Sequence, residues 1–171
     1  MPRRETTAVG TSDYTFHMRI ALGADHAGVA LKEDIKRLLD ARGVSYTDFG
    51  TNSTESVDYP DYATKVAHEV SSGQFDRGIL FCGSGIGMAI AANKVAGIRA
   101  APVVDEQSAV LSREHNDANV LSLGERLTPP DLARRIVDKF LDTPFAGGRH
   151  QRRVDKIAAL DAERESHDAA H

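Results

Sequence analysis

The chain is built around the stretch Ile79-Leu80-Phe81-Cys82-Gly83-Ser84-Gly85-Ile86-Gly87. Residues 79–82 have strand character and run directly into three glycines separated by single residues. The run 88–94 that follows is compatible with a helix. Glycine permits a positive φ angle and lets a ligand approach the backbone closely. The pattern therefore predicts a buried strand, a tight turn and the start of a helix.

Cys82, the single cysteine of the chain, lies at the edge of this turn. A thiol beside a helix N-terminus ionises readily and then serves as a base or nucleophile. The amides of such a turn also suit an anion or a developing oxyanion. Two plainer interpretations stay open. A lone buried cysteine commonly acts as a small hydrophobic residue, and this glycine spacing matches neither the dinucleotide-binding motif nor the P-loop.

Composition and charge restrict the classes of function. Of 171 residues, 41% are hydrophobic and 27% are charged, which is the balance of an ordinary globular domain. The net charge of −4 argues against general affinity for nucleic acid. Apolar runs fall far short of the roughly 18 residues of a membrane span. One cysteine allows neither an internal disulfide nor a cysteine-based metal site, and it fits a reducing cytoplasm.

Strand and helix patterns alternate along the chain. Helical patterns separate the expected strands and also follow the last one; the strands are expected at 19–22, 44–49, 79–82, 97–104 and 120–123. Such alternation implies right-handed crossovers, and so a five-stranded parallel sheet with both faces covered. The first helix is expected to bury its apolar side and to expose Lys32, Glu33, Asp34 and Lys36.

The ends of the chain differ from its centre. Residues 1–17 are polar and lack periodicity, so we expect a disordered extension before a domain over residues 18–162. The last helix is expected to begin near Arg149 and to fray after Asp161. Residues 163–171 would then form a polar tail.

Ligands of parallel sheets bind outside the carboxyl ends of the strands. We expect three segments there: residues 23–28, residues 82–87, and the segment reaching His115-Asn116. The side chains predicted to share this rim are Asp25, His26, Cys82, Ser84, His115 and Asn116. In the plainer alternative, Asp25 only caps the next helix and His115 lies in a polar surface turn.

Arg149 and Arg153 are four residues apart, so they share a face of the last helix. Two guanidinium groups on one face bind a phosphate well, although a solvated basic face would look the same. Arg126 is a further candidate for an anion contact. The histidines lack metal-binding spacing, so we expect no metal site.

Seven motifs, in order over about residues 18–160, resemble the B-type ribose-5-phosphate isomerases, a group that also holds the galactose-6-phosphate isomerase subunits. They are Gly23-Ala24-Asp25-His26-Ala27-Gly28, Asp58-Tyr59-Pro60, Cys82-Gly83-Ser84-Gly85-Ile86-Gly87, Ile90-Ala91-Ala92-Asn93-Lys94, Gly97-Ile98-Arg99-Ala100, His115-Asn116-Asp117-Ala118-Asn119 and Gly148-Arg149-His150-Gln151-Arg152-Arg153.

The resemblance implies a three-layer, Rossmann-like α/β fold and a homodimer, or a tetramer, with active sites at the subunit interface. It implies a cytoplasmic enzyme that interconverts ribose 5-phosphate and ribulose 5-phosphate without a cofactor. Cys82 matches the base of one branch of the family. Another branch has glycine at this position and a glutamate where this chain has Met88.

The resemblance also assigns the remaining roles. His115 matches the residue that opens the sugar ring. The positions that match substrate or phosphate contacts are Asp25, His26, Asn116, Arg126, Arg149 and Arg153, and the amides of Gly83, Ser84, Gly85, Ile86 and Gly87 would stabilise the enediolate. Two alternatives are an isomerase of a six-carbon sugar, such as allose or galactose 6-phosphate, and a non-catalytic phosphate-binding module.

Overall fold

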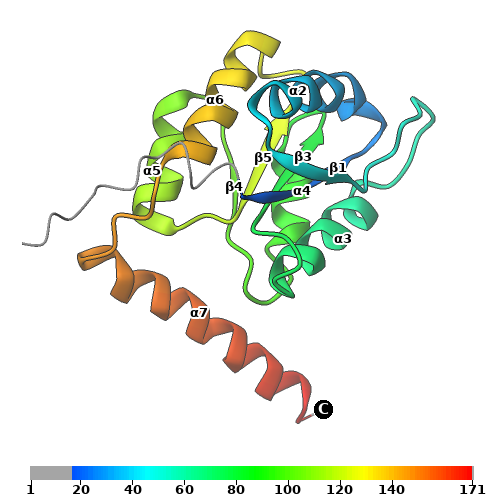
Figure 1. The fold of residues 1–171 in the computed structure, drawn as a ribbon. Coiled ribbons are helices and arrows are strands. Elements are labelled where there is room, and N and C mark those ends of the chain that lie inside the picture. The colour runs from blue at the N-terminus through cyan, green and yellow to red at the C-terminus, as the bar shows by residue number, and fades with distance from the viewer. Residues whose placement is uncertain (1–16, 171) are drawn as a thin grey trace, which may run out of the picture.

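The computed structural model describes residues 17–170, so the extension predicted over residues 1–17 lies, except for His17, outside the described residues. Strands and helices alternate as the sequence predicts (Figure 1). The strands are β1 (Arg19–Ala24), β2 (Ser45–Asp48), β3 (Arg77–Cys82), β4 (Ala100–Pro102) and β5 (Val120–Gly124). The helices are η1 (His26–Gly28), α2 (Val29–Arg42), α3 (Tyr59–Ser71), α4 (Ile86–Ala92), α5 (Glu106–Asn116), α6 (Pro130–Asp142) and α7 (Arg149–Asp168).

The five strands form one parallel sheet in the order β2-β1-β3-β5-β4, which confirms the predicted sheet. The edge strand β4 is shorter than the predicted strand 97–104. Gly97 has a φ of 81°, outside the β region. The amide of Arg99 donates to the side chain of Asn119 at 2.8 Å instead of to a strand carbonyl. Strand geometry therefore begins only at Ala100.

Helices cover both faces of the sheet, so the predicted three layers are confirmed (Figure 1). Successive side chains of the central strand β3 point to opposite faces. Leu80 packs in the hydrophobic core under α3 and α4, whereas Phe81 packs in the core under α2, α5 and α6. All six residues of β3 are buried.

The order in which the strands are added to the sheet reverses between β1 and β3, and all strands stay parallel. The chain leaves β1 for α2 on one face and leaves β3 for α4 on the other, although the two strands are paired as far as Ala24 and Phe81. Diverging connections at neighbouring strand ends open a crevice, where ligands of such sheets bind. The loops after β1 and β3 therefore face each other.

Lys32 and Asp34 on α2 contradict the prediction that they face solvent. Lys32 is completely buried, and its Nζ contacts a carboxylate oxygen of Asp48 at 2.8 Å and the carbonyl of Thr51 at 2.7 Å. Asp34 pairs with Arg134 of α6 at 2.7 Å. The loop after β2 and helix α6 cover these positions, and buried charges are tolerated because each finds a partner.

Helix α7 extends to Asp168, beyond Asp161 where the sequence predicts fraying. Asp161 accepts a hydrogen bond from the amide of Gly97 at 2.8 Å, and Arg164 donates to the carbonyl of Lys94 at 2.9 Å. These contacts hold the distal half of a helix that otherwise projects from the body (Figure 1).

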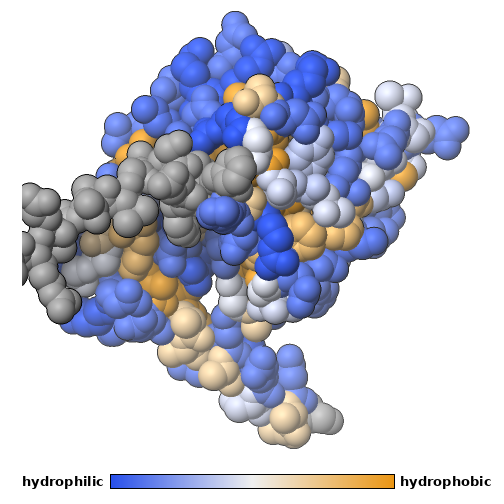
Figure 2. All heavy atoms as spheres, viewed as in Figure 1, coloured by the Kyte–Doolittle hydropathy of each residue, from blue (hydrophilic) through white to orange (hydrophobic). Residues whose placement is uncertain are grey.

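Hydrophobic side chains stay exposed on this helix. Ile157 is 42% and Leu160 55% exposed, and Figure 2 shows hydrophobic residues where α7 meets the body of the molecule.

Within residues 17–170, no helix has the length and hydrophobicity that crossing a membrane requires.

Candidate active site

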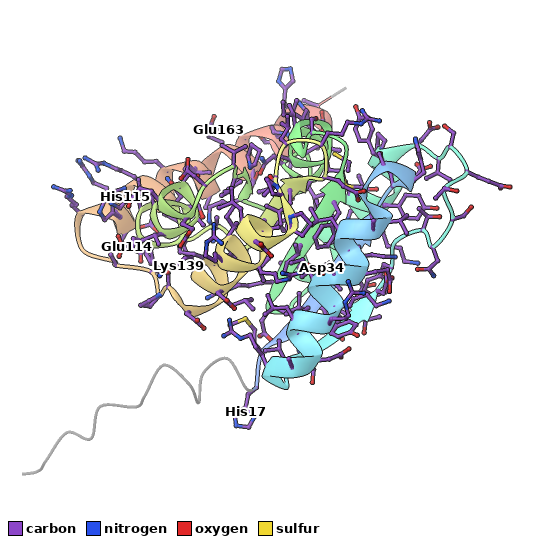
Figure 3. The ribbon with its side chains drawn as sticks, turned by 90° about the horizontal axis from the view of Figure 1, so that it is seen from above. His17, Asp34, Glu114, His115, Lys139 and Glu163 are labelled. Carbon is purple, nitrogen blue, oxygen red and sulfur yellow. The ribbon has the colours of Figure 1, made fainter. Side chains whose placement is uncertain are left out.

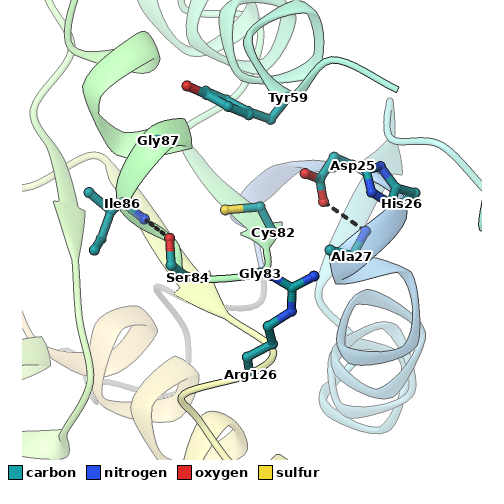
Figure 4. Close-up of a pocket in the computed structure, with 10 residues that line it drawn as sticks. All are labelled: Asp25, His26, Ala27, Tyr59, Cys82, Gly83, Ser84, Ile86, Gly87 and Arg126. Carbon is teal, nitrogen blue, oxygen red and sulfur yellow. Dashed lines mark hydrogen bonds between the residues drawn. The ribbon is translucent and has the colours of Figure 1, made fainter. Parts of the chain in front are cut away.

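A pocket of about 480 Å³ occupies the crevice between the ends of β1 and β3 (Figure 4). It is lined by Asp25, His26, Ala27, Tyr59, Cys82, Gly83, Ser84, Ile86, Gly87 and Arg126. The structure thus brings together the two glycine-containing loops that the sequence places at the carboxyl edge of the sheet, and adds Arg126 from the loop after β5.

Cys82 is the last residue of β3, and its sulfur lies at the floor of the pocket (Figure 4). The residue is only 5% exposed. The backbone amide of Gly85 donates a hydrogen bond to Sγ at 3.1 Å. The sulfur is therefore held at the pocket as the acceptor of a backbone N–H.

The turn from residue 83 to residue 87 is fixed by its neighbours. Gly85 adopts a φ of 77°, a left-handed conformation that disfavours side chains. Its carbonyl accepts a hydrogen bond from the hydroxyl of Ser122 at 2.6 Å, and the hydroxyl of Ser84 accepts one from the amide of Ile86 at 3.3 Å. The turn is therefore braced by β5 and by its own side chain.

Asp25 and His26 follow β1 and line the opposite side of the pocket. Asp25 caps η1 by accepting a hydrogen bond from the amide of Ala27 at 2.9 Å, and the residue also lines the pocket. The amide of Val57 donates to Nδ1 of His26 at 3.2 Å. Because Nδ1 accepts, the neutral ring carries its proton on Nε2, which is left to donate to a ligand.

Arg126 supplies a guanidinium group to the pocket (Figure 4). The amide of Arg126 donates to the carbonyl of Gly83 at 3.0 Å, and the amide of Glu125 donates to the carbonyl of Cys82 at 2.8 Å. The chain after β5 therefore stays paired with the glycine turn and carries Arg126 to the pocket.

Tyr59 is a lining residue that the sequence does not single out. It begins α3, is 41% exposed, and holds its ring against the backbone of Gly87. The motif Asp58-Tyr59-Pro60 could have indicated this position. A helix that follows a strand and a polar loop begins near the carboxyl edge of the sheet, where the pocket lies.

His115 and Asn116 do not reach this pocket, so the prediction of one shared rim is wrong within a single chain. They end α5, and the chain then enters β5 at Val120. A helix that follows one parallel strand returns the chain to the amino edge of the sheet. His115 therefore lies at the edge opposite Cys82, and Figure 3 shows it beside Glu114 at the end of α5.

A second cluster forms around His115. Its ring stacks on that of His150, with centroids 4.2 Å apart and an angle of 13° between planes. Burial lowers the pKa of His150, and the positive charges of His115, Arg149 and Arg153 lower it further. Arg149 and Arg153 are exposed at the start of α7, so the predicted phosphate ligands lie with His115 and Asn116.

The predicted site residues thus fall into two groups, at opposite edges of one sheet. Asp25, His26, Arg126 and the turn 82–87 except Gly85 line the pocket, whereas His115, Arg149 and Arg153 lie in the second cluster. Across residues 17–170, no group of three or more His, Cys, Asp or Glu side chains is arranged to hold a metal ion.

Known proteins are similar to this chain in sequence and in fold. Residues 20–157 match the Ribose/Galactose Isomerase family. The chain is 51% identical to ribose-5-phosphate isomerase B of Escherichia coli K12, over 85% of this chain and 98% of that protein.

Two solved structures match the fold closely. The structure of Clostridium thermocellum ribose-5-phosphate isomerase B has a TM-score of 0.84 and 53% identity, covering 85% of this chain and 99% of the other. The Mycoplasma genitalium enzyme with bound ribulose-5-phosphate has a TM-score of 0.83 and 44% identity, covering 86% and 99%. With most of its length matched in sequence and in fold, the chain belongs to the Ribose/Galactose Isomerase family, among the B-type ribose-5-phosphate isomerases.

Proposed function

We propose that the protein interconverts D-ribose 5-phosphate and D-ribulose 5-phosphate by proton transfer through a cis-enediolate. The observation that carries the proposal is Cys82 in the pocket, with the amide of Gly85 on its sulfur at 3.1 Å. Aldose–ketose isomerisation needs one base that reaches two adjacent carbons. A single thiolate at the floor of a pocket meets this need.

The chemistry at the sulfur conserves protons. The Cys82 thiolate takes the proton from C2 of the open-chain aldose and the cis-enediolate forms. The thiol proton exchanges with solvent before the sulfur delivers a proton to C1, and the hydroxyl proton passes from O2 to O1 to complete the ketose. The amide of Gly85 already donates its hydrogen bond to the sulfur. We therefore propose that other amides of the turn, those of Gly83, Ser84 and Gly87, donate to the enediolate oxygens. Each well-aligned donor to such an oxyanion contributes about 3–4 kcal/mol to the barrier reduction.

Ring opening precedes this step, because ribose 5-phosphate is mostly a furanose. We assign the general acid to His115 and the acceptor for the anomeric hydroxyl to Asp25, whose carboxylate borders the pocket. Asn116, next to His115, would hold a sugar hydroxyl. Proton transfer by a placed side chain typically accelerates a step about 10²–10⁴-fold.

These roles require a second copy of the chain, because His115 and Cys82 lie at opposite edges of one sheet. We propose a homodimer in which the His115 cluster of one subunit closes the pocket of the other. An isologous two-fold interface forms two such sites. The phosphate would then meet His26 and Arg126 of one subunit, and Arg149 and Arg153 of its partner.

Exposed hydrophobic side chains support this assembly. Ile86 at the pocket and Ile90 one turn later on α4 are 53% and 58% exposed. Ile157 and Leu160 expose a similar surface on the projecting helix α7. Paired apolar surfaces of this kind favour a partner. A tetramer built from two such dimers would leave the sites unchanged.

The reaction moves only protons, so it requires no cofactor. A free thiol that must stay reduced also favours the cytoplasm.

The test is proton exchange. In heavy water, the protein should convert ribose 5-phosphate to ribulose 5-phosphate and introduce deuterium at C1 of the ketose, as followed by NMR. A phosphate-binding module would show neither, and iodoacetamide would leave its ligand binding intact. Because the family is named for ribose and galactose, allose and galactose 6-phosphates belong in the same assay. Faster turnover of either would move the assignment to a six-carbon substrate.

A further inference from the structure

The stacked rings of His115 and His150 join two helices at the second cluster. Near-parallel rings with centroids 4.2 Å apart are in face-to-face contact. His115 is half-buried in the last turn of α5, and His150 is the second residue of α7 and only 8% exposed. None of the roles proposed above uses His150.

The backbone holds His150 in place. The amide of Ala146 donates to the carbonyl of Glu114 at 3.1 Å, and the amide of His150 donates to the carbonyl of Gly147 at 3.0 Å. The loop before α7 is thus tied to the end of α5. Along α7, His150 and Val154 are the two buried residues, four apart on one side of the helix.

The charges around His150 favour a neutral ring. Glu114 and His115 face it from α5, and Arg149 and Arg153 flank it on α7. Three of these four groups are cationic or become so, and they add to the effect of burial. A neutral ring can lie against a protonated His115 without the repulsion that two stacked cations would suffer.

We propose that His150 is a positioning residue for ring opening, whose neutral imidazole holds the imidazole of His115 by stacking. The inference rests on the function proposed above and on the role of His115 in it. A ring with a fixed plane directs its N–H along one line, and general acid catalysis depends on that alignment. His150 does not touch the sugar in this scheme.

Two readouts separate ring opening from enediolate chemistry. Conversion of ribose 5-phosphate requires ring opening. Deuterium exchange at C1 of ribulose 5-phosphate does not, because its O5 carries the phosphate and the ketose stays acyclic. The ratio of conversion to exchange therefore reports ring opening alone, whereas general damage to the fold or to the dimer lowers both rates.

His150→Ala should lower the ratio about tenfold, and His150→Phe should restore it to within about threefold of the native ratio, because phenylalanine supplies a flat ring without a charge. Val154→Ala is the matched control, since it removes the other buried contact of α7 and leaves the stack intact. Its ratio should stay native even if both rates fall.

Equal losses of conversion and exchange in His150→Ala would mean that His150 only stabilises the fold, and this result would overturn the inference. If His150→Phe does not restore the ratio of conversion to exchange, the proposal that His150 acts by stacking is also overturned. If the native protein shows neither conversion nor exchange, the proposed function itself fails. The two failures are therefore distinguishable.

Discussion

The backbone amide of Gly85 points at the sulfur of Cys82, 3.1 Å away and three residues back along the chain. The left-handed conformation of Gly85 turns this amide toward the strand end, and the hydroxyl of Ser122 holds its carbonyl from the neighbouring strand. The Cys-Gly-Ser-Gly spacing therefore places a hydrogen-bond donor on the proposed base. Two predictions follow from this contact, one for the sulfur and one for the amide.

Replacing Cys82 with alanine should lower kcat for ribose 5-phosphate about 10³-fold or more, because no other group on the pocket floor can shuttle the proton. Binding of the sugar phosphate should change little, since the phosphate contacts are intact. Steady-state kinetics and calorimetric titration measure the two quantities. His68→Ala, at an exposed position on α3, is the control. Substantial turnover by Cys82→Ala would contradict the assignment of Cys82 as the base.

Gly85→Ala should lower both stability and kcat. An alanine at a φ of 77° is strained by about 1–3 kcal/mol, and its Cβ would lie 3.0 Å from the carbonyl carbon of Leu123. Relief of that contact would move the amide off the sulfur of Cys82.

Gly73→Ala is the matched control, because Gly73 has the same φ with no atom within 4 Å of an added Cβ. Thermal unfolding should show a loss of stability for both variants, but only Gly85→Ala should lose kcat by about tenfold. Equal kcat values for the two variants would mean that the amide does not act on the sulfur.

Mixing two defective variants should restore activity if subunits share the site. Cys82→Ala keeps its His115 cluster, and His115→Ala keeps its pocket. Random reassociation places half of the chains in mixed dimers with one intact site each, so about a quarter of native activity should return. The mixture is prepared by partial denaturation and refolding, and each variant is treated alone as a control. Activity no greater than the mean of the two parents would argue for a site within one chain.

Asp34 should make stability depend on pH in the acid range. The hydrogen bond from Arg134 holds the pKa of Asp34 below its ordinary value of 3.8, with further help from Arg37 and against the cost of burial. A carboxyl with a depressed pKa stabilises the fold above its unfolded pKa and loses that contribution as pH falls through its folded pKa.

Arg134→Gln should therefore lower Tm at neutral pH, and the difference from the native protein should shrink below about pH 4. Arg37→Gln provides a comparison, because Arg37 pairs with the same carboxylate at 2.9 Å but is largely exposed. It should have the smaller effect at neutral pH. A difference for Arg134→Gln that stays constant down to pH 3 would contradict this account.

The sequence alone predicted the layered sheet and the position of the pocket at its carboxyl edge. Alternating strands and helices force a parallel sheet, and such a sheet gathers the segments that follow its strands at one edge. Asp25, His26 and the turn from Cys82 to Gly87 each follow a strand, so their meeting was predictable. Each of these inferences depends only on neighbours along the chain and on the direction of a strand.

The tertiary structure decided what depends on packing between distant segments. His115 lies in the last turn of a helix, which returned it to the far edge of the sheet, beside α7. Lys32 carries a charge in a polar stretch, yet a loop and its partner Asp48 enclose it completely. Helical periodicity records polarity along one element, whereas burial depends on which other element covers that face, and only the folded chain settles that.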